Sequence, residues 1–128
     1  MRALLDTHAL FWRANGLLRL SKKVRQLLAS LEADVFVSAA SAWEPPKNVR
    51  LRKLPEGAEF AMDFTANVQR LGFHPLPIAV DQCRRAGLLP GLHKDPFDRI
   101  AIAQTRAENM PIVSNEQAFD EYMVRRIW

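Results

Sequence analysis

Short apolar runs alternate along this chain with segments in which apolar residues recur every three or four positions. The runs at residues 3–5, 34–38 and 111–114 are typical of buried strands, and residues 73–77 and 125–128 suit strands at a sheet edge. Helical spacing follows Ser21, where Val24, Leu27, Leu28 and Leu31 share one face. It recurs at residues 59–71, 81–88 and 96–109. Because strands alternate with helices, the pattern predicts an α/β fold with a mainly parallel sheet.

The stretch of residues 93–104, HKDPFDRIAIAQ, begins one of these helices. Asp95 is placed to cap it, because its carboxylate can accept a backbone N–H of the first turn. Pro96 then occupies the first helical position, where its missing N–H has no partner to lose. Asp98 lies in the same turn. Two interpretations of this pair remain open: both acids serve the helix end, or they belong to a cation site.

Further carboxylates follow the predicted strands. Asp6 comes directly after the first strand, Glu44 lies beyond the second and Glu116 beyond residues 111–114. Asp6 alone is also suited to cap a helix at residues 7–13. In an open parallel sheet these strand ends share one edge, where ligands bind. With Asp98, four carboxylates in one crevice would repel strongly without a cation, and hard oxygen ligands suit Mg²⁺ or Mn²⁺. The residues therefore predict metal-assisted phosphodiester hydrolysis.

Charge adds a candidate partner. The chain has 128 residues, enough for one domain, and a net charge of +4. Residues 13–53 carry nine Lys and Arg against three acids, which is either a solvated face or a surface that contacts phosphates. The candidate nucleic-acid contacts are Lys22, Lys23, Arg25, Arg50, Arg52 and Lys53. The single Cys83, the absence of an apolar membrane-length run and the early Asp6 predict a cytoplasmic protein.

Five stretches together resemble one family. These are LLDTHAL, SAASAWE, VRLRKLP, HKDPFDRIAIAQ and VSNEQAFDEYMVRRIW, in order along the chain. They look like a PIN-domain ribonuclease toxin of the VapC type. The resemblance implies a single PIN domain over residues 1–128, with a three-layer α/β/α fold, and an Mg²⁺-dependent endoribonuclease inhibited by a cognate antitoxin. It implies that Asp6, Glu44 and Asp98 bind the metal, with Asp95 and Glu116 as accessory acids. We also expect a homodimer.

Two departures from the family pattern bear on activity. Pro45 and Pro46 follow Glu44 where the family has helix-forming residues, and Glu116 replaces the usual Asp. A helix that starts near Ser38 would carry both prolines in its interior, where each removes a hydrogen bond and clashes with the preceding turn, so we predict that this helix ends at or near Trp43–Glu44. Residues 47–54 would then be irregular and Glu44 displaced. The alternative function is a catalytically weakened PIN-fold module that binds antitoxin or RNA.

Other classes of protein fit less well. A phosphatase that used Asp6 as its nucleophile would need a second aspartate two residues later, where the chain has His8. A receiver domain would need paired acids at the first strand and a lysine after a late strand, and neither is found. A binding module without catalysis would keep the core and the basic surface but would not need the acids.

Overall fold

A five-stranded sheet forms the centre of the computed structural model, which describes residues 1–51, 58–91 and 95–128. The strands lie in the order β3-β2-β1-β4-β5, and every neighbouring pair is parallel. Their bounds are β1 (Arg2–Leu5), β2 (Asp34–Ser38), β3 (His74–Leu76), β4 (Ile112–Val113) and β5 (Arg126–Ile127). The predicted α/β fold with a parallel sheet is confirmed, and the short outer strands β3 and β5 lie at the two edges.

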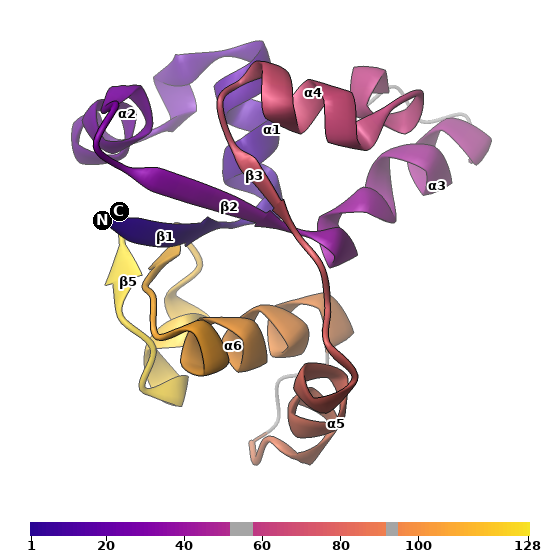
Figure 1. Ribbon diagram of the computed structural model, residues 1–128, viewed down its shortest axis with the longest axis vertical. Coiled ribbons are helices and arrows are strands. Elements are labelled where there is room, and N and C mark those ends of the chain that lie inside the picture. Colours follow the sequence, from indigo (N-terminus) through magenta and orange to yellow (C-terminus); the bar gives the residue numbers. More distant parts are fainter. Residues whose placement is uncertain (52–57, 92–94) are drawn as a thin grey trace.

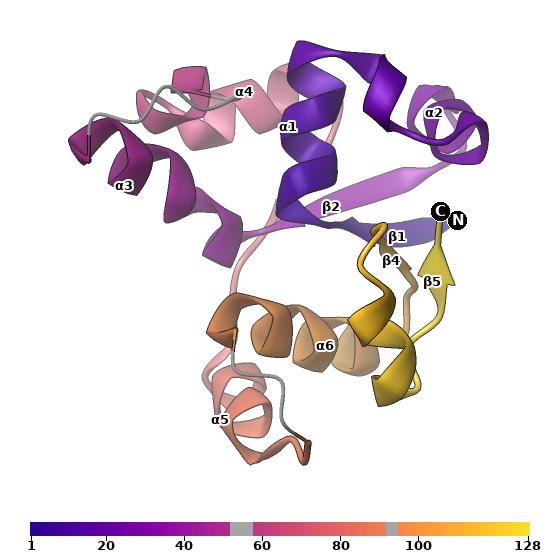
Figure 2. The same ribbon diagram turned by 180° about the vertical axis from the view of Figure 1, so that it is seen from behind.

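Helices cover both faces of the sheet and complete three layers. Helices α1, α2, α3 and α4 lie on one side, and α5 and α6 on the other (Figures 1 and 2). Their bounds are α1 (Thr7–Asn15), α2 (Lys22–Ala29), α3 (Glu44–Arg50), α4 (Phe64–Arg70), α5 (Val80–Leu88) and α6 (Pro96–Glu108). The described residues also form four short 3-10 helices, η1 (Leu17–Arg19), η2 (Ala39–Ala42), η3 (Ala58–Ala61) and η4 (Gln117–Tyr122). Among the described helices, none is long and apolar enough to cross a membrane.

The core follows from the alternation of side chains along each strand. Leu5 and Val113 pack with α1 and α2 in the larger apolar cluster, while Ile112, one residue from Val113, packs on the opposite face with Ile102 and Phe119. Successive residues of a strand point to opposite faces, so strands buried on both sides are apolar throughout. This explains why the strands appear in the sequence as continuous apolar runs.

The predicted helix starts are confirmed at two positions. Ser21 accepts a hydrogen bond from the Val24 N–H at 3.1 Å, which caps α2. Asp95 accepts one from the Phe97 N–H at 2.9 Å, and Pro96 occupies the first turn of α6. These side chains satisfy backbone donors that have no partner within the helix. Helix α2 ends at Ala29, however, so Leu31 is fully exposed and does not continue its apolar face.

The helix predicted over residues 59–71 is wrong as a single element. It is divided into η3 and α4. Asp63 has an extended backbone and accepts a hydrogen bond from the Ala66 N–H at 3.0 Å, so it starts a new helix. Phe60 and Val68 are nevertheless both buried, because each half presents its own apolar residue to the core.

The prediction that the chain becomes irregular after Glu44 is also wrong. Helix α3 begins at Glu44 and continues to Arg50, and its first intrahelical bond runs from the Lys47 N–H to the Trp43 carbonyl at 3.3 Å. Pro45 and Pro46 therefore lie in the first turn, where backbone N–H groups have no intrahelical partner. The preceding residues form η2, so no long helix has to carry the prolines in its interior. Residues 52–54 of the predicted irregular segment lie outside the described part of the chain.

Candidate active site

The strand order itself marks a place for a ligand site. In the sheet, β2 and then β3 lie on one side of β1, whereas β4 and then β5 lie on its other side. In open α/β sheets, ligands bind outside the carboxyl ends of the strands where the order reverses. Asp6 directly follows β1 and Ser114 directly follows β4, so both lie at this point.

A hollow of about 150 Å³ lies at this edge, and all five acids predicted as site residues line it. Asp6 comes from the end of β1, Glu44 from the first turn of α3 and Glu116 from the loop after β4. Asp95 and Asp98 come from the start of α6. Thr7, His8, Ser41 and Phe97 line it as well. The acids are thus brought together from four separate parts of the chain, as the strand ends predict.

Asp6 is the most enclosed of the acids with a perturbed pKa. Its side chain keeps part of its surface exposed, but surrounding protein largely desolvates the carboxyl, and this burial raises its pKa. The hydrogen bond from Ser114 and the nearby His8 act in the opposite direction, while Glu116 raises the pKa further. A carboxylate in low dielectric beside another acid is stabilised by a bound cation.

Ser114 connects two of the acids. Its Oγ donates a hydrogen bond to Asp6 Oδ2 at 2.9 Å and accepts one from the Glu116 N–H at 3.0 Å. The serine is completely buried, so its position is fixed by the end of β4. It therefore orients Asp6 and the loop of Glu116 together, as residues behind metal ligands commonly do.

A pair of hydroxyl groups joins the segment that follows β1, which carries Asp6, to the segment that follows β2, which leads to Glu44. Thr7 Oγ1 and Ser41 Oγ share a hydrogen bond of 2.6 Å. Thr7 follows Asp6, and Ser41 lies in η2, three residues before Glu44. The sequence analysis assigned no role to Ser114 or Thr7. The available signals were a hydroxyl residue at the end of a predicted strand, Ser114, and one next to an acid, Thr7.

The two acids at the start of α6 were predicted either to serve the helix end or to belong to a cation site, and the structure distinguishes them. Asp95 is the N-cap of α6, as the capping interpretation predicts, and its side chain also borders the hollow. Asp98 is not the cap, and it lines both this hollow and an adjoining smaller one that Ala101 also lines. Glu116 likewise caps η4, through the Ala118 N–H at 3.4 Å. Asp95 and Glu116 thus each combine a structural contact with a place at the hollow.

The lining suits a hard divalent cation. Its acidic members are all carboxylates, His8 also lines it, and no Lys or Arg is among the described residues around it. Oxygen ligands of this kind favour Mg²⁺ or Mn²⁺. Within the described residues, no three Asp, Glu, His or Cys side chains are already grouped as an ion would hold them. Asp6, Glu44 and Asp98 therefore share one hollow without forming a closed ligand set as they stand.

The predicted basic surface is divided. Lys22, Lys23 and Arg25 are exposed on α2, and Arg50 is exposed at the end of α3. These two helices lie at opposite sides of the molecule (Figures 1 and 2), so their basic residues form two separate groups. Arg52 and Lys53 lie outside the described residues. The sequence placed all six in one stretch because it cannot show how far the fold separates α2 from α3.

Comparisons with known proteins agree with this architecture. A family model of the PIN domain matches residues 3–123. No curated protein matches the chain closely enough in sequence to count as a relative.

Several solved structures share the fold. One is VapBC2 from Rickettsia felis bound to a DNA fragment from its promoter, with a TM-score of 0.70, 14% identity and coverage of 99% of this chain and 98% of that one. Another is a toxin–antitoxin complex from Klebsiella pneumoniae, with a TM-score of 0.68, 16% identity and coverage of 98% and 96%. FitAcB from Neisseria gonorrhoeae gives a TM-score of 0.62, 20% identity and coverage of 98% and 96%. At these identities the likeness concerns the fold.

Proposed function

The chain belongs to the PIN-domain family, and from this premise we propose that it is a metal-dependent endoribonuclease, the toxin of a type II toxin–antitoxin pair. The observation that carries the proposal is the hollow at the switch point of the sheet, lined by Asp6, Glu44, Asp95, Asp98 and Glu116. Nucleases of this family generally use divalent metal ions, and the carboxylates fit such an ion by their chemistry.

Each acid has a role in this proposal. Asp6, Glu44 and Asp98 hold the cation, and Glu116 adds a further oxygen at the rim beside Asp6. A bound Mg²⁺, or Mn²⁺ in its place, supplies Lewis-acid stabilisation to a phosphoryl oxygen and lowers the pKa of water. Ser114 keeps one oxygen of Asp6 engaged, which favours the ionised carboxylate that a metal needs. Asp95 fixes the start of α6 and thereby the position of Asp98.

The RNA substrate would be held by its phosphates. Lys22, Lys23 and Arg25 on α2 form one exposed basic group and Arg50 on α3 another, and Arg52 and Lys53 follow Arg50 in the sequence. Phosphate contacts need positive charge and carry no base information, so these groups supply affinity and the hollow supplies the chemistry.

The partners follow from the same family membership. The structure from Klebsiella pneumoniae is a toxin–antitoxin complex, which supports a cognate antitoxin for this chain. Such an antitoxin would place an Arg or Lys in the acidic hollow, where its charge replaces that of the metal. We further propose a homodimer in the cytoplasm.

The alternative, a weakened module that binds without efficient cleavage, rested on Pro45, Pro46 and Glu116. The prolines no longer favour it, because α3 begins at Glu44 and this acid lines the hollow. Glu116 remains as a side chain one methylene longer than the family's aspartate. An active nuclease is therefore the better proposal.

Cleavage of RNA by the purified protein tests this proposal. The chain is co-expressed with the product of its neighbouring gene, separated from it, and incubated with RNA in Mg²⁺ or in a chelator. We expect cleavage with Mg²⁺ alone, and its loss in Asp98→Asn, which removes a ligand charge at constant volume. Asp34→Asn is the matched control, because Asp34 is an exposed acid at the start of β2, the opposite end of the strand from the hollow. Equal cleavage by Asp98→Asn and the wild type would refute the proposal.

A further inference from the structure

A second and larger hollow lies at the other end of helix α6 from the acids. Its volume is about 680 Å³, within the range of small-molecule sites. The acidic hollow takes Asp95 and Asp98 from the start of α6, whereas this one takes Thr105, Arg106 and Asn109 from its end. Eight residues of helix separate Asp98 from Arg106, which corresponds to about 12 Å along the axis. The two hollows are therefore separate sites.

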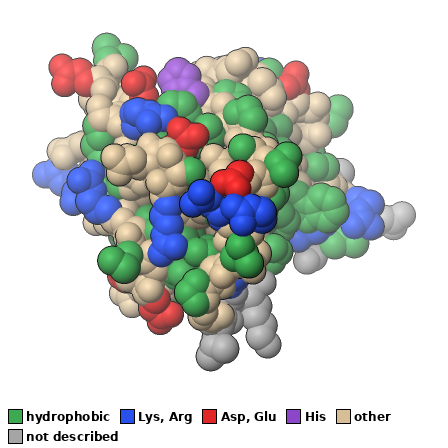
Figure 3. Space-filling view, turned by 60° about the horizontal axis from the view of Figure 1, so that its bottom comes forward, with side chains coloured by type: hydrophobic (Ala, Val, Ile, Leu, Met, Phe, Trp, Pro, Cys, Tyr) green, Lys and Arg blue, Asp and Glu red, His purple; other side chains and the backbone are tan. Residues whose placement is uncertain are grey.

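Three arginines from three elements line this hollow. Arg2 begins β1, Arg106 lies in the last turn of α6, and Arg125 directly precedes β5. No acid is among the described residues that line it. Seen from the side of α5 and α6, Lys and Arg side chains gather over the middle of the molecule, with Asp and Glu side chains interspersed among them (Figure 3).

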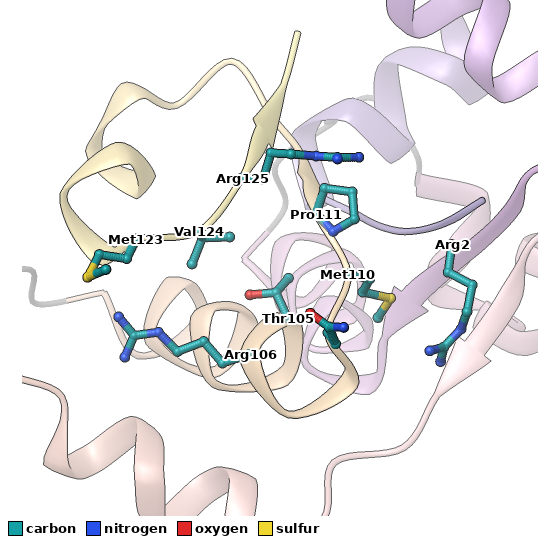
Figure 4. Close-up of a pocket in the computed structure, with 9 residues that line it drawn as sticks. Arg2, Thr105, Arg106, Met110, Pro111, Met123, Val124 and Arg125 are labelled. Atoms are coloured by element: carbon teal, nitrogen blue, oxygen red, sulfur yellow. The ribbon is translucent and has the colours of Figure 1, made fainter.

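The three arginines differ in the hydrogen bonds that their guanidinium groups already make within the protein. Arg2 donates to the Glu108 carbonyl at 3.1 Å and to its carboxylate at 3.3 Å, so it also offsets the negative end of α6. Arg106 donates to the Tyr122 carbonyl. Among the described residues, the Arg125 guanidinium has no hydrogen-bond or ion-pair partner, and it extends over Pro111 (Figure 4). An exposed guanidinium without a partner retains all its donors for a ligand.

Apart from Thr105 and Asn109, the rest of the lining is apolar. Met110 and Pro111 are buried at the base, and Val124 and Met123 lie on the side of η4. A surface of methionine, proline and valine suits a flat apolar body such as a base or a ribose face, because methionine adapts its shape. The hollow thus combines cationic donors from three elements with apolar side chains.

We propose that this hollow binds the phosphate and adjoining nucleoside of a nucleotide. Arginine presents planar, paired donors that match phosphate oxygens, and Arg125 is the principal contact. The nucleotide could be free in solution or the phosphorylated end of an RNA chain, since both present the same chemistry. The proposal does not depend on RNA cleavage, because it concerns binding without divalent metal at residues remote from the acids.

Methyl NMR of methionine-labelled protein in EDTA tests this site directly. Met110 and Met123 line the hollow, whereas Met62 is exposed between η3 and α4 and serves as an internal control. We expect AMP to shift Met110 and Met123 but not Met62. We expect inorganic phosphate to compete, and adenosine to bind at least tenfold more weakly. A 5′-phosphorylated trinucleotide that binds more tightly than AMP would identify an RNA end as the source, and equal affinity would identify a free nucleotide.

Variants of Arg125 separate phosphate recognition from general charge. Arg125→Gln is expected to weaken AMP binding at least tenfold, and Arg125→Lys to retain part of the affinity because it keeps the charge without the planar fork. Arg70→Gln, an exposed arginine on α4, is the matched control and leaves binding unchanged. Thermal melts check that each variant is folded. Equal binding by Arg125→Gln and the wild type, adenosine binding as tightly as AMP, or no shift at millimolar AMP would overturn the proposal.

Discussion

Ser114 Oγ donates a hydrogen bond of 2.9 Å to Asp6 Oδ2, joining residues that are 108 positions apart in the chain. This contact connects the ends of β1 and β4, the two strands at which the order of the sheet reverses. It orients an acid whose pKa is raised by burial. The site is therefore built by the sheet topology and held by a hydroxyl that is not itself a metal ligand.

Ser114→Ala tests this positioning role. The variant removes a hydrogen bond to a charged group, which contributes about 1.5–3 kcal/mol, so we expect Mg²⁺ affinity to fall roughly 10- to 100-fold. The acidic limb of the pH–rate profile should also move to higher pH, because the serine lowers the pKa of Asp6. Ser30→Ala is the matched control, since Ser30 Oγ accepts only an exposed N–H of Glu32. A purely structural role would lower the melting temperature and leave the pH profile in place.

Asp6→Asn is expected to stabilise the metal-free protein at neutral pH. The pKa of Asp6 is raised above its usual 3.8, so the folded state loses stability as pH rises from that value through the folded-state pKa. An amide avoids this loss. The gain should therefore appear in melts at neutral pH and vanish below pH 3.8, where the wild-type carboxyl is protonated in both states.

Asp81→Asn is a control, because the carboxyl of Asp81 is expected to affect stability with the opposite dependence on pH. Arg84 and Arg85 lower the pKa of Asp81, so its contribution is present above the usual value of 3.8 and lost as pH falls through the folded-state pKa. That variant is expected to be no more stable than the wild type at neutral pH. A stabilisation by Asp81→Asn equal to that by Asp6→Asn would contradict the assignment of burial as the cause.

Replacing the prolines is expected to change activity little. Pro45 and Pro46 lie in the first turn of α3, so Pro46→Ala restores no missing hydrogen bond. The loss of proline instead increases the freedom of the unfolded chain and lowers stability by about 0.4–1 kcal/mol. Cleavage rates should remain within about twofold of the wild type, by the same reasoning that first-turn proline is tolerated. A large gain in Mg²⁺-dependent rate would show that the prolines do displace Glu44.

The separation of the basic residues predicts how binding responds to salt. Replacing Lys22, Lys23 and Arg25 with Gln removes the α2 group, whereas Arg50→Gln alters only the α3 group. If each α2 residue contacts one phosphate, the slope of log K against log salt should fall by about 2, because each contact to single-stranded nucleic acid contributes about 0.7. Fluorescence anisotropy with a labelled RNA and the Asp98→Asn protein measures the slope without cleavage. An unchanged slope in the triple variant would show that the α2 group is a solvated face.

The fold and the acids could be predicted from the sequence because both depend on local signals. Strands buried on both faces are continuous apolar runs, and acids directly after such runs meet at one edge of a parallel sheet. Asp6 and Glu116 line the same hollow for this reason, whereas Asp98 reaches it from the first turn of α6.

The features that could not be predicted depend on contacts between residues that lie far apart in the sequence. The approach of Ser114 to Asp6 and of Thr7 to Ser41 is decided by strand pairing, which an isolated hydroxyl does not indicate. The start of α3 at Glu44 depends on η2 ending just before it, and this placed the prolines in a first turn. The arginine-lined hollow gathers Arg2, Arg106 and Arg125 from distant parts of the chain, so no basic stretch revealed it.

The location of a bound metal ion tests the central claim most directly. Crystals soaked with Mn²⁺, a substitute for Mg²⁺ with strong anomalous scattering, should show one or more anomalous peaks within the hollow between Asp6, Glu44 and Asp98. The same soak of Asp98→Asn should weaken or abolish those peaks, while Asp34→Asn leaves them unchanged. An Mn²⁺ ion bound only elsewhere, in crystals of a protein that cleaves RNA in solution, would contradict the account.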